Sequence, residues 1–159
     1  MAENPTIAKN PAVAERSCPE CGQTMRRDLR DFTITYQGFS STFPMPGWYC
    51  TGHNCEEAIA NSQDMKVSDR ELHILKAKAA NLLAAVEVRR VRKTLGLTQR
   101  EAGLILGGGP NAFQKYETAE LVPSKAISNL LRVLEAHPSA LEVLRREAQS
   151  PESSQASSA

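Results

Sequence analysis

The sequence predicts an α+β protein: a small β-hairpin domain that carries four cysteines, followed by an all-α domain of five helices. Three observations predict this class. Two pairs of cysteines enclose a stretch in which apolar and polar residues alternate, as in a half-buried strand. From about residue 68 the apolar residues recur instead at helical spacing. Further on, three glycines and a proline separate two short helical segments.

The chain of 159 residues is long enough for two small domains. We expect residues 1–16, which are polar and aperiodic, to be a disordered extension. The β domain is predicted at 17–67, a helical linker at 68–85 and the all-α domain at 86–148. The serine-rich residues 149–159 are predicted to be a disordered tail.

The composition limits where the protein works. No apolar run approaches the roughly 18 residues that a membrane span needs, so we expect no contact with a membrane. The N-terminus lacks the basic-then-apolar pattern of a signal peptide. We therefore expect a cytoplasmic protein whose cysteines are not paired in disulfides.

The cysteines have the spacing of a structural zinc site. Cys18 and Cys21 are two residues apart before a glycine, which is typical of a zinc knuckle, and Cys50 and Cys55 form a looser second pair. Four thiolates in two pairs can complete a tetrahedral site and leave no position open for catalysis. A set in which His53 replaces Cys50 or Cys55 is an alternative, as is a redox or metal-free role.

Between the two pairs the sequence predicts a β-hairpin. Residues 32–36, FTITY, alternate as a strand, Gln37-Gly38 forms a turn, and residues 39–43 continue as a second strand. Two prolines and Gly47 are expected to end this strand before Trp48. Such a small domain needs a metal for stability. Its core is predicted to contain five aromatic residues, one or two of which would instead form a partner surface: Phe32, Phe39, Phe43, Trp48 and Tyr49.

The linker carries the spacing of a capping box, Ser68 to Glu71, which predicts that a helix opens at Ser68. The sequence allows either one continuous helix over 68–94 or a joint near residues 80–86. A helix over Val86–Leu95 then begins the all-α domain, and the later helices follow Ser124 and Pro138.

The centre of this domain is a predicted helix-turn-helix. Thr98 and Glu101 have the capping-box spacing at the start of the first helix. The run Gly107–Pro110 stops that helix, and Asn111 can cap the second one. Two helices joined by a short glycine turn are typical of DNA-binding proteins, in which the second helix enters the major groove.

Asn111 and Lys115 lie four residues apart and share one face of the second helix, with Gln114 beside them. Asparagine can bond adenine, and lysine can bond guanine or a phosphate. We also expect Gln99 and Arg100 to contact DNA, whereas Phe113 and Tyr116 turn inward as core. The alternative is that Asn111 only caps its helix beside a solvated lysine.

Residues 86–148 hold ten basic and seven acidic side chains, whereas residues 1–67 hold six and eight. Five basic residues fall between Val88 and Glu101 without an intervening acid, and they predict phosphate contact beside the helix-turn-helix. They are Arg89, Arg90, Arg92, Lys93 and Arg100. A solvated helix face is the alternative.

An enzyme is not expected. His53, His73 and His137 have neither a nucleophile nor a carboxylate at a recognisable spacing, and the cysteines already have a metal role.

Over about residues 17–145 the sequence resembles the MqsA (YgiT-type) antitoxins of bacterial type II toxin–antitoxin systems. The resemblance is carried by CPECG at 18–22, the second cysteine pair before Glu56-Glu57, VRKTLGLTQREA at 91–102, GGGPNAFQKYE at 107–117 and LLRVLEAHP at 130–138.

The resemblance implies an N-terminal domain that holds structural zinc through Cys18, Cys21, Cys50 and Cys55 and binds an RNA-cleaving toxin. It further implies an XRE-like helix-turn-helix domain that forms a homodimer and represses its own operon by binding a palindromic operator. Base reading would fall to Asn111 and Lys115. A free-standing zinc-stabilised regulator without a toxin is the alternative.

Two departures from the family pattern bear on these roles. The second cysteine pair encloses four residues where one known member of the family has two, which leaves the role of His53 open. Lys115 stands where the same member has arginine, and a lysine cannot form the planar fork to guanine.

Overall fold

The computed structural model describes residues 15–149, which form two compact units. The first unit runs to Phe32 and resumes over Thr42–Val67, and the second takes Thr33–Ser41 and everything described from Ser68 onward. The predicted extension and tail, residues 1–16 and 149–159, lie outside the described residues except at their inner ends, where Arg16 starts a strand and Gln149 ends a helix.

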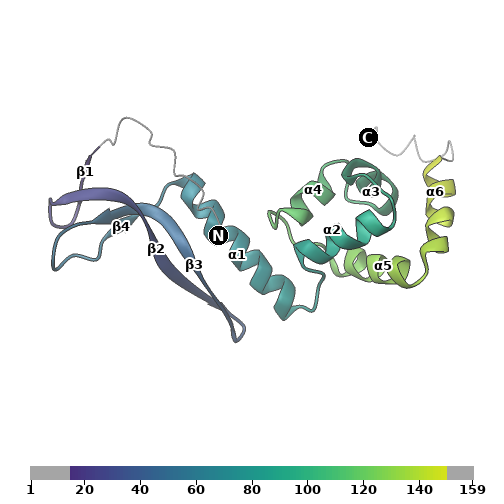
Figure 1. Ribbon diagram of the computed structural model, residues 1–159, viewed down its shortest axis with the longest axis horizontal. Coiled ribbons are helices and arrows are strands. Elements are labelled where there is room, and N and C mark those ends of the chain that lie inside the picture. Colours follow the sequence, from purple (N-terminus) through teal and green to yellow (C-terminus); the bar gives the residue numbers. More distant parts are fainter. Residues whose placement is uncertain (1–14, 150–159) are drawn as a thin grey trace, which may run out of the picture. The chain divides into compact units, whose positions relative to one another are not determined.

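A four-stranded sheet in the order β1-β2-β3-β4 dominates the N-terminal half (Figure 1). The strands are β1 (Arg16–Ser17), β2 (Thr24–Tyr36), β3 (Phe39–Cys50) and β4 (Ala58–Ile59). The predicted turn between β2 and β3 is confirmed. Gln37 and Gly38 both have positive φ, 47° and 83°, as a two-residue hairpin turn of type I′ requires.

The prediction that Pro44, Pro46 and Gly47 end the second strand is wrong, because β3 continues to Cys50. The Cys50 N–H donates to Glu57 O on the β4 side, whereas the Thr51 N–H donates to Thr24 O at the start of β2. Successive residues of a strand direct their N–H groups to opposite edges, so both prolines face the β4 edge. There β4 pairs only with Trp48 and Tyr49, and the prolines remove no hydrogen bond from the β2 ladder.

The predicted aromatic core of this half is confirmed in part. Met25 is fully buried and packs with Cys18 and Cys50, and Trp48, Cys55 and Ile59 are only partly buried against them. Phe43 is buried and makes an edge-to-face contact with Phe32, which remains 47% exposed. The core of this unit therefore combines the cysteine cluster with some of the predicted aromatic residues.

Helix α1 (Ser62–Ala79) begins six residues before the predicted start at Ser68. The Asn61 side chain accepts from the N–H groups of Gln63 and Asp64, and the Asp64 carboxylate accepts from the Asn61 N–H. This reciprocal pair satisfies the first helical donors, so an asparagine–aspartate box at 61–64 takes the role predicted for Ser68 and Glu71.

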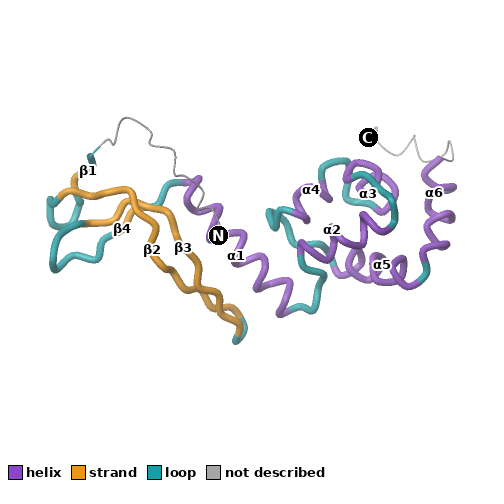
Figure 2. Tube along the Cα trace, viewed as in Figure 1, coloured by secondary structure: helices purple, strands orange, loops and turns teal. Residues whose placement is uncertain are grey.

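The structure decides between one long helix and a joint in favour of the joint. Helix α1 ends at Ala79, Asn81 has a positive φ of 50°, and α2 (Ala85–Thr94) begins after residues 80–84. Figure 2 shows this joint as a loop between the two helices.

The five predicted helices of the C-terminal half are confirmed, and a 3-10 turn over Pro138–Ala140 is added before the last one. After α2 they are α3 (Gln99–Leu106), α4 (Ala112–Glu117), α5 (Lys125–Ala136) and α6 (Leu141–Gln149). Local caps define two of the starts. Thr98 and Glu101 form the predicted capping box, and Ser124 accepts from the Ile127 N–H.

These helices surround one apolar core. Phe113 and Tyr116 turn inward as predicted and meet edge to face, with ring centroids 5.6 Å apart. Val88 and Val91 of α2 and Leu131 of α5 pack into the same core and are fully buried. Within the described residues, no helix is both long enough and apolar enough to cross a membrane.

Candidate functional site

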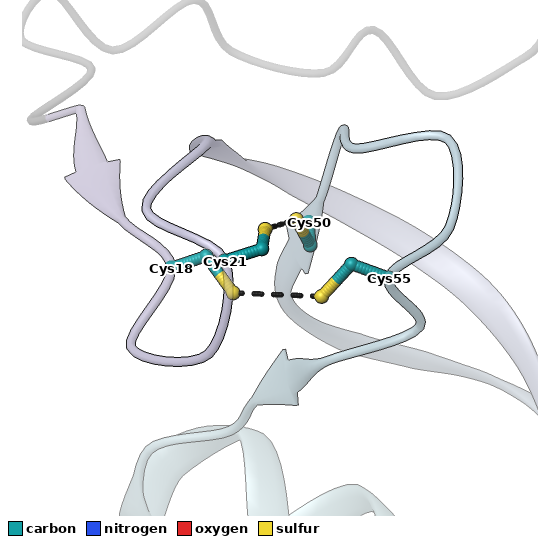
Figure 3. A group of neighbouring side chains, drawn as sticks. All are labelled: Cys18, Cys21, Cys50 and Cys55. Atoms are coloured by element: carbon teal, nitrogen blue, oxygen red, sulfur yellow. Dashed lines mark hydrogen bonds between the residues drawn. The ribbon is translucent and has the colours of Figure 1, made fainter.

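The structure brings the four cysteines together from segments far apart in the sequence (Figure 3). Cys18 and Cys21 come from the β1–β2 connection, Cys50 ends β3, and Cys55 precedes β4. All four Sγ atoms lie within 4.8 Å of one another, with Cys18 and Cys55 3.7 Å apart and Cys21 and Cys50 3.4 Å apart. Such a cluster can hold a metal ion.

Backbone hydrogen bonds shape the turns that carry these thiols. In the first turn the Cys18 N–H donates to Gln23 O and the Gly22 N–H donates to Cys18 O, with Gly22 at a φ of 73°. In the second turn the Gly52 N–H donates to the Cys50 Sγ at 3.3 Å. The first two bonds hold the shape of the Cys18 turn, and the Gly52 N–H stabilises negative charge on the Cys50 sulfur, as a metal-binding thiolate needs.

The thiols are unequal as acids. Backbone donors, first of all the Cys21 N–H, outweigh burial and lower the pKa of Cys18 to about 7. The backbone donor of Glu57 also lowers the pKa of Cys55, but burial and the neighbouring thiols outweigh it and raise that pKa to about 12. Four adjacent thiols cannot all lose their protons without a compensating positive charge, so a cation would stabilise the cluster.

His53 lies exposed in the loop between Cys50 and Cys55 and is not part of the cluster. The four residues between Cys50 and Cys55 therefore do not prevent the four cysteines from coming together, and His53 does not replace one of them.

A partly buried ion pair in the same unit was not predicted from the sequence, because its partners are 37 residues apart. Arg27 of β2 donates two hydrogen bonds, of 2.8 and 2.7 Å, to the buried carboxylate of Asp64 at the start of α1.

The turn of the helix-turn-helix depends on a close backbone approach. Gly107, Gly108 and Gly109 all have positive φ, between 85° and 101°. A Cβ on Gly103 of α3 would lie 2.0 Å from the Gly109 carbonyl oxygen. Only glycine at position 103 lets this turn fold back against α3, and that contact sets where α4 begins.

The structure exposes Asn111, Gln114 and Lys115 at the start and outer face of α4. Asn111 occupies the N-cap position, but its side chain makes no capping hydrogen bond. The interpretation that Asn111 serves only as a cap therefore has no support in the geometry. Arg100 is also exposed, whereas Gln99 is half-buried and its amide donates to the Glu117 carboxylate at 2.8 Å.

The predicted basic patch is smaller than the sequence indicates. Arg92 is buried, forms an ion pair with Glu117 and donates to Leu97 O at 2.6 Å, while Arg90 pairs with Glu135. Lys93 and Arg100 are exposed. Arg89 also lies near Glu117, with its Nε 4.0 Å from the carboxylate. The acids that pair with these three arginines are distant in sequence, so the run of positive charge in the chain does not reveal their pairing.

Glu117, the last residue of α4, is the residue of this site that sequence reasoning missed. Its side chain is 3% exposed and receives hydrogen bonds from Arg92 of α2 and Gln99 of α3. Burial opposes its ionisation, but these two donors outweigh burial and hold the pKa of Glu117 below the ordinary value. One ionised carboxylate thus ties three helices together behind the exposed face of α4.

The fold and the cluster define a helix-turn-helix protein with a four-cysteine unit that can bind a metal. The sequence model of the antitoxin component of the bacterial toxin–antitoxin system, MqsA, matches residues 16–145. Antitoxin MqsA of Escherichia coli strain K12 is 36% identical over 131 residues, which cover 80% of this chain and 98% of that protein. The chain therefore belongs to the MqsA antitoxin family.

Family membership makes the chain an antitoxin of a toxin–antitoxin system, a regulatory protein with a toxin as its partner. Of the two functions predicted from the sequence, it favours the antitoxin over the free-standing regulator.

Proposed function

We propose that this antitoxin neutralises an RNA-cleaving toxin through its cysteine unit and represses its own operon through the helix-turn-helix. The observation that carries the DNA-binding part is the exposed set of Asn111, Gln114 and Lys115 on a helix held from behind by Glu117. A buried ion pair fixes the helix, and the polar side chains on its other face remain available for base edges.

In this proposal Asn111 bonds the N6 and N7 edge of an adenine, and Lys115 contacts guanine or a phosphate. Arg100 and Lys93 contact the phosphate backbone. Gln99 was predicted to contact DNA directly. Its bond to Glu117 supports an indirect role instead, in which it orients α4.

The test compares DNA from upstream of the gene with a scrambled duplex of the same length. Asn111→Ala should weaken binding to the upstream DNA by about 1–3 kcal/mol, or roughly tenfold to a hundredfold, and should leave scrambled DNA nearly unaffected. Asn129→Ala, at an exposed asparagine of α5, is the matched control for loss of a surface amide. Equal weakening of both duplexes by Asn111→Ala would contradict base reading.

We propose that the metal is zinc and that its role is structural. Tetrahedral zinc with bonds of about 2.3 Å to sulfur places neighbouring sulfurs about 3.8 Å apart. The distances of 3.7 and 3.4 Å in the cluster are close to this value. With Cys18, Cys21, Cys50 and Cys55 as ligands, the site has no open position for a substrate.

The toxin-binding surface is proposed to lie on the hairpin. Phe32 is 47% exposed and Leu29 of the same strand is 56% exposed, and both are large apolar side chains. Exposed aromatic and aliphatic groups of this kind are typical of protein interfaces. The tagged full chain, recovered from its native cell, should retain a small ribonuclease. Phe32→Ser should lose this partner while upstream DNA is still bound, and retention by Phe32→Ser would exclude this surface.

We further propose a cytoplasmic homodimer that binds a two-fold operator through its C-terminal half. Exposed apolar residues of three helices support a second copy as the partner of this half: Leu104, Val133 and Val143. Val143→Glu should convert a dimer into a monomer in sedimentation experiments, and an unchanged mass would exclude α6 from the contact.

A further inference from the structure

The second half of α1 belongs to the same compact unit as the helix-turn-helix. From this half of the helix, the half-buried His73 directs its Nδ1 to the Ala119 carbonyl oxygen at 2.9 Å. A carbonyl oxygen can only accept, so His73 donates from Nδ1. The acceptor lies in the turn that follows α4, two residues beyond its end at Glu117.

The backbone of this turn is strained. Ala119 has a φ of 57°, a left-handed conformation that alanine adopts at a cost in free energy because its Cβ crowds the backbone. Gln37 and Asn81 are the other non-glycine residues with positive φ in the described chain. A strained conformation persists only where the surrounding contacts enforce it, and the bond from His73 is such a contact.

The same turn is also hydrogen-bonded to α4, the helix proposed to read DNA (called the reading helix below). The N–H groups of Glu120 and Leu121 both donate to the Lys115 carbonyl, at 2.9 and 3.2 Å. Lys115 is one of the exposed residues proposed to contact DNA. The hydrogen bonds therefore form a short chain from His73 through the Ala119 turn to the backbone of Lys115.

Packing places α1 against the same turn. A small, partly open pocket of about 20 Å³ is lined by α1 and the joint that follows it, and by the end of α4 and the turn after it. Its lining includes His73, Ile74, Ala77, Tyr116, Ala119 and Leu121. Arg70 lies one helical turn before His73, and its guanidinium nitrogen is 3.5 Å from a carboxylate oxygen of Glu120. This exposed pair adds little free energy, so His73 is the main polar contact of α1 with the turn.

We propose that His73 is a positioning residue for DNA reading: its bond to Ala119 holds the turn after α4, and through it the backbone of Lys115, in the conformation that reads the operator. This proposal rests on the proposed DNA-binding function. It makes the second half of α1 an element of the reading site, although none of its residues is assigned a contact with DNA.

Two substitutions separate the hydrogen bond from the packing of the side chain. His73→Leu keeps a side chain that can fill much of the same space and removes the Nδ1 donor. His73→Asn places an amide nitrogen where His73 has Nδ1, and so retains the donor on a smaller side chain. Lys76→Leu, a substitution at the next half-buried polar position of α1 in the described chain, controls for added apolar surface.

In full-length protein, His73→Leu should reduce the ratio of affinity for upstream DNA over scrambled DNA by about two- to tenfold, the loss expected for one hydrogen bond. His73→Asn should restore most of this ratio, and Lys76→Leu should leave it unchanged. An unchanged ratio in His73→Leu would overturn the proposal. An equal loss in His73→Leu and His73→Asn would also overturn it, because the bond would not be the cause.

A measurement without DNA keeps this test separate from the proposed function. Amide hydrogen exchange of Glu120 and Leu121, whose N–H groups bind Lys115, should accelerate in His73→Leu and return toward the wild-type rate in His73→Asn. If the wild-type protein binds no upstream DNA selectively, the DNA-binding proposal fails while this result still decides whether His73 holds the turn. Unchanged exchange in His73→Leu would show that it does not.

Discussion

Glu117 at the end of α4 accepts hydrogen bonds from the buried guanidinium of Arg92 in α2, in a pair whose side chains are 3% and 10% exposed. Arg92 also donates to the Leu97 carbonyl at the loop that precedes α3. The pair thus connects α2, the start of α3 and the end of the reading helix. Each of the two buried charges is compensated by the other, so removing either side chain leaves an unpaired charge inside the protein.

Removing one partner of this pair should destabilise the helical half strongly. Glu117→Ala leaves Arg92 charged and buried, for which we expect a loss of about 3–5 kcal/mol. The double variant Arg92→Met with Glu117→Leu should lose less, because no unpaired charge remains. Urea unfolding followed by helical circular dichroism measures both. A double variant less stable than Glu117→Ala would argue that the pair does not act as a unit.

The stability of the helical half should decrease in acid. The folded-state pKa of Glu117 lies below its unfolded value, so its contribution is fully present above the unfolded pKa and is lost as the pH falls through the folded pKa. The loss should therefore begin below about pH 4.3, the usual pKa of glutamate. Urea unfolding between pH 3 and 7 should show a flatter profile for Glu117→Gln. Glu120→Gln, at an exposed acid, should retain the wild-type slope.

A methyl group at Gly103 should disrupt the helix-turn-helix. Its Cβ would lie 2.0 Å from the Gly109 oxygen, so the turn must move, and we expect Gly103→Ala to cost about 3 kcal/mol or more. Gly109→Ala is the matched control, because its Cβ meets no atom within 4 Å and only its φ of 85° is strained. That strain should cost about 1–2 kcal/mol. Thermal melting of both variants tests the order, and equal losses would contradict the close approach.

The start of α1 can be tested with two substitutions at its alternative caps. Asn61→Ala removes the acceptor for the N–H groups of Gln63 and Asp64 and should cost about 1 kcal/mol. Ser68→Ala, at the start predicted from the sequence, lies inside the helix and should have almost no effect. Chemical denaturation compares them, and a larger loss for Ser68→Ala would restore the original boundary.

Removing the metal should unfold the unit that carries the four cysteines and leave the C-terminal helices folded. Trp48, the only tryptophan of the chain, packs against the cysteine cluster, so its fluorescence reports on this unit. A zinc chelator should shift the Trp48 emission to longer wavelength while most of the helical circular dichroism remains. Added zinc should reverse the change. Unchanged Trp48 emission in protein shown to be metal-free would refute a structural metal.

The sequence by itself determined the features that depend on neighbouring residues. The Thr98–Glu101 box, the Ser124 cap and the Gln37-Gly38 turn follow from hydrogen bonds and backbone preferences within a few residues. Helical spacing placed Phe113 and Tyr116 inside and Lys115 outside for the same reason. The cysteine spacing likewise predicted a four-thiol cluster, because ligands of one metal come as close pairs.

Tertiary structure decided the features that join distant segments. Pro44 and Pro46 continue a strand because no strand of residues 15–149 pairs with their edge at that point, which depends on where β4 ends. Arg92 is not available in the basic patch, because it is buried and pairs with Glu117, 25 residues away. A buried charge is stable only when it is paired. His73 donates to the carbonyl oxygen of Ala119, 46 residues away. Hydrogen bonds and ion pairs across such separations depend on how the elements pack, and no local pattern in the chain specifies them.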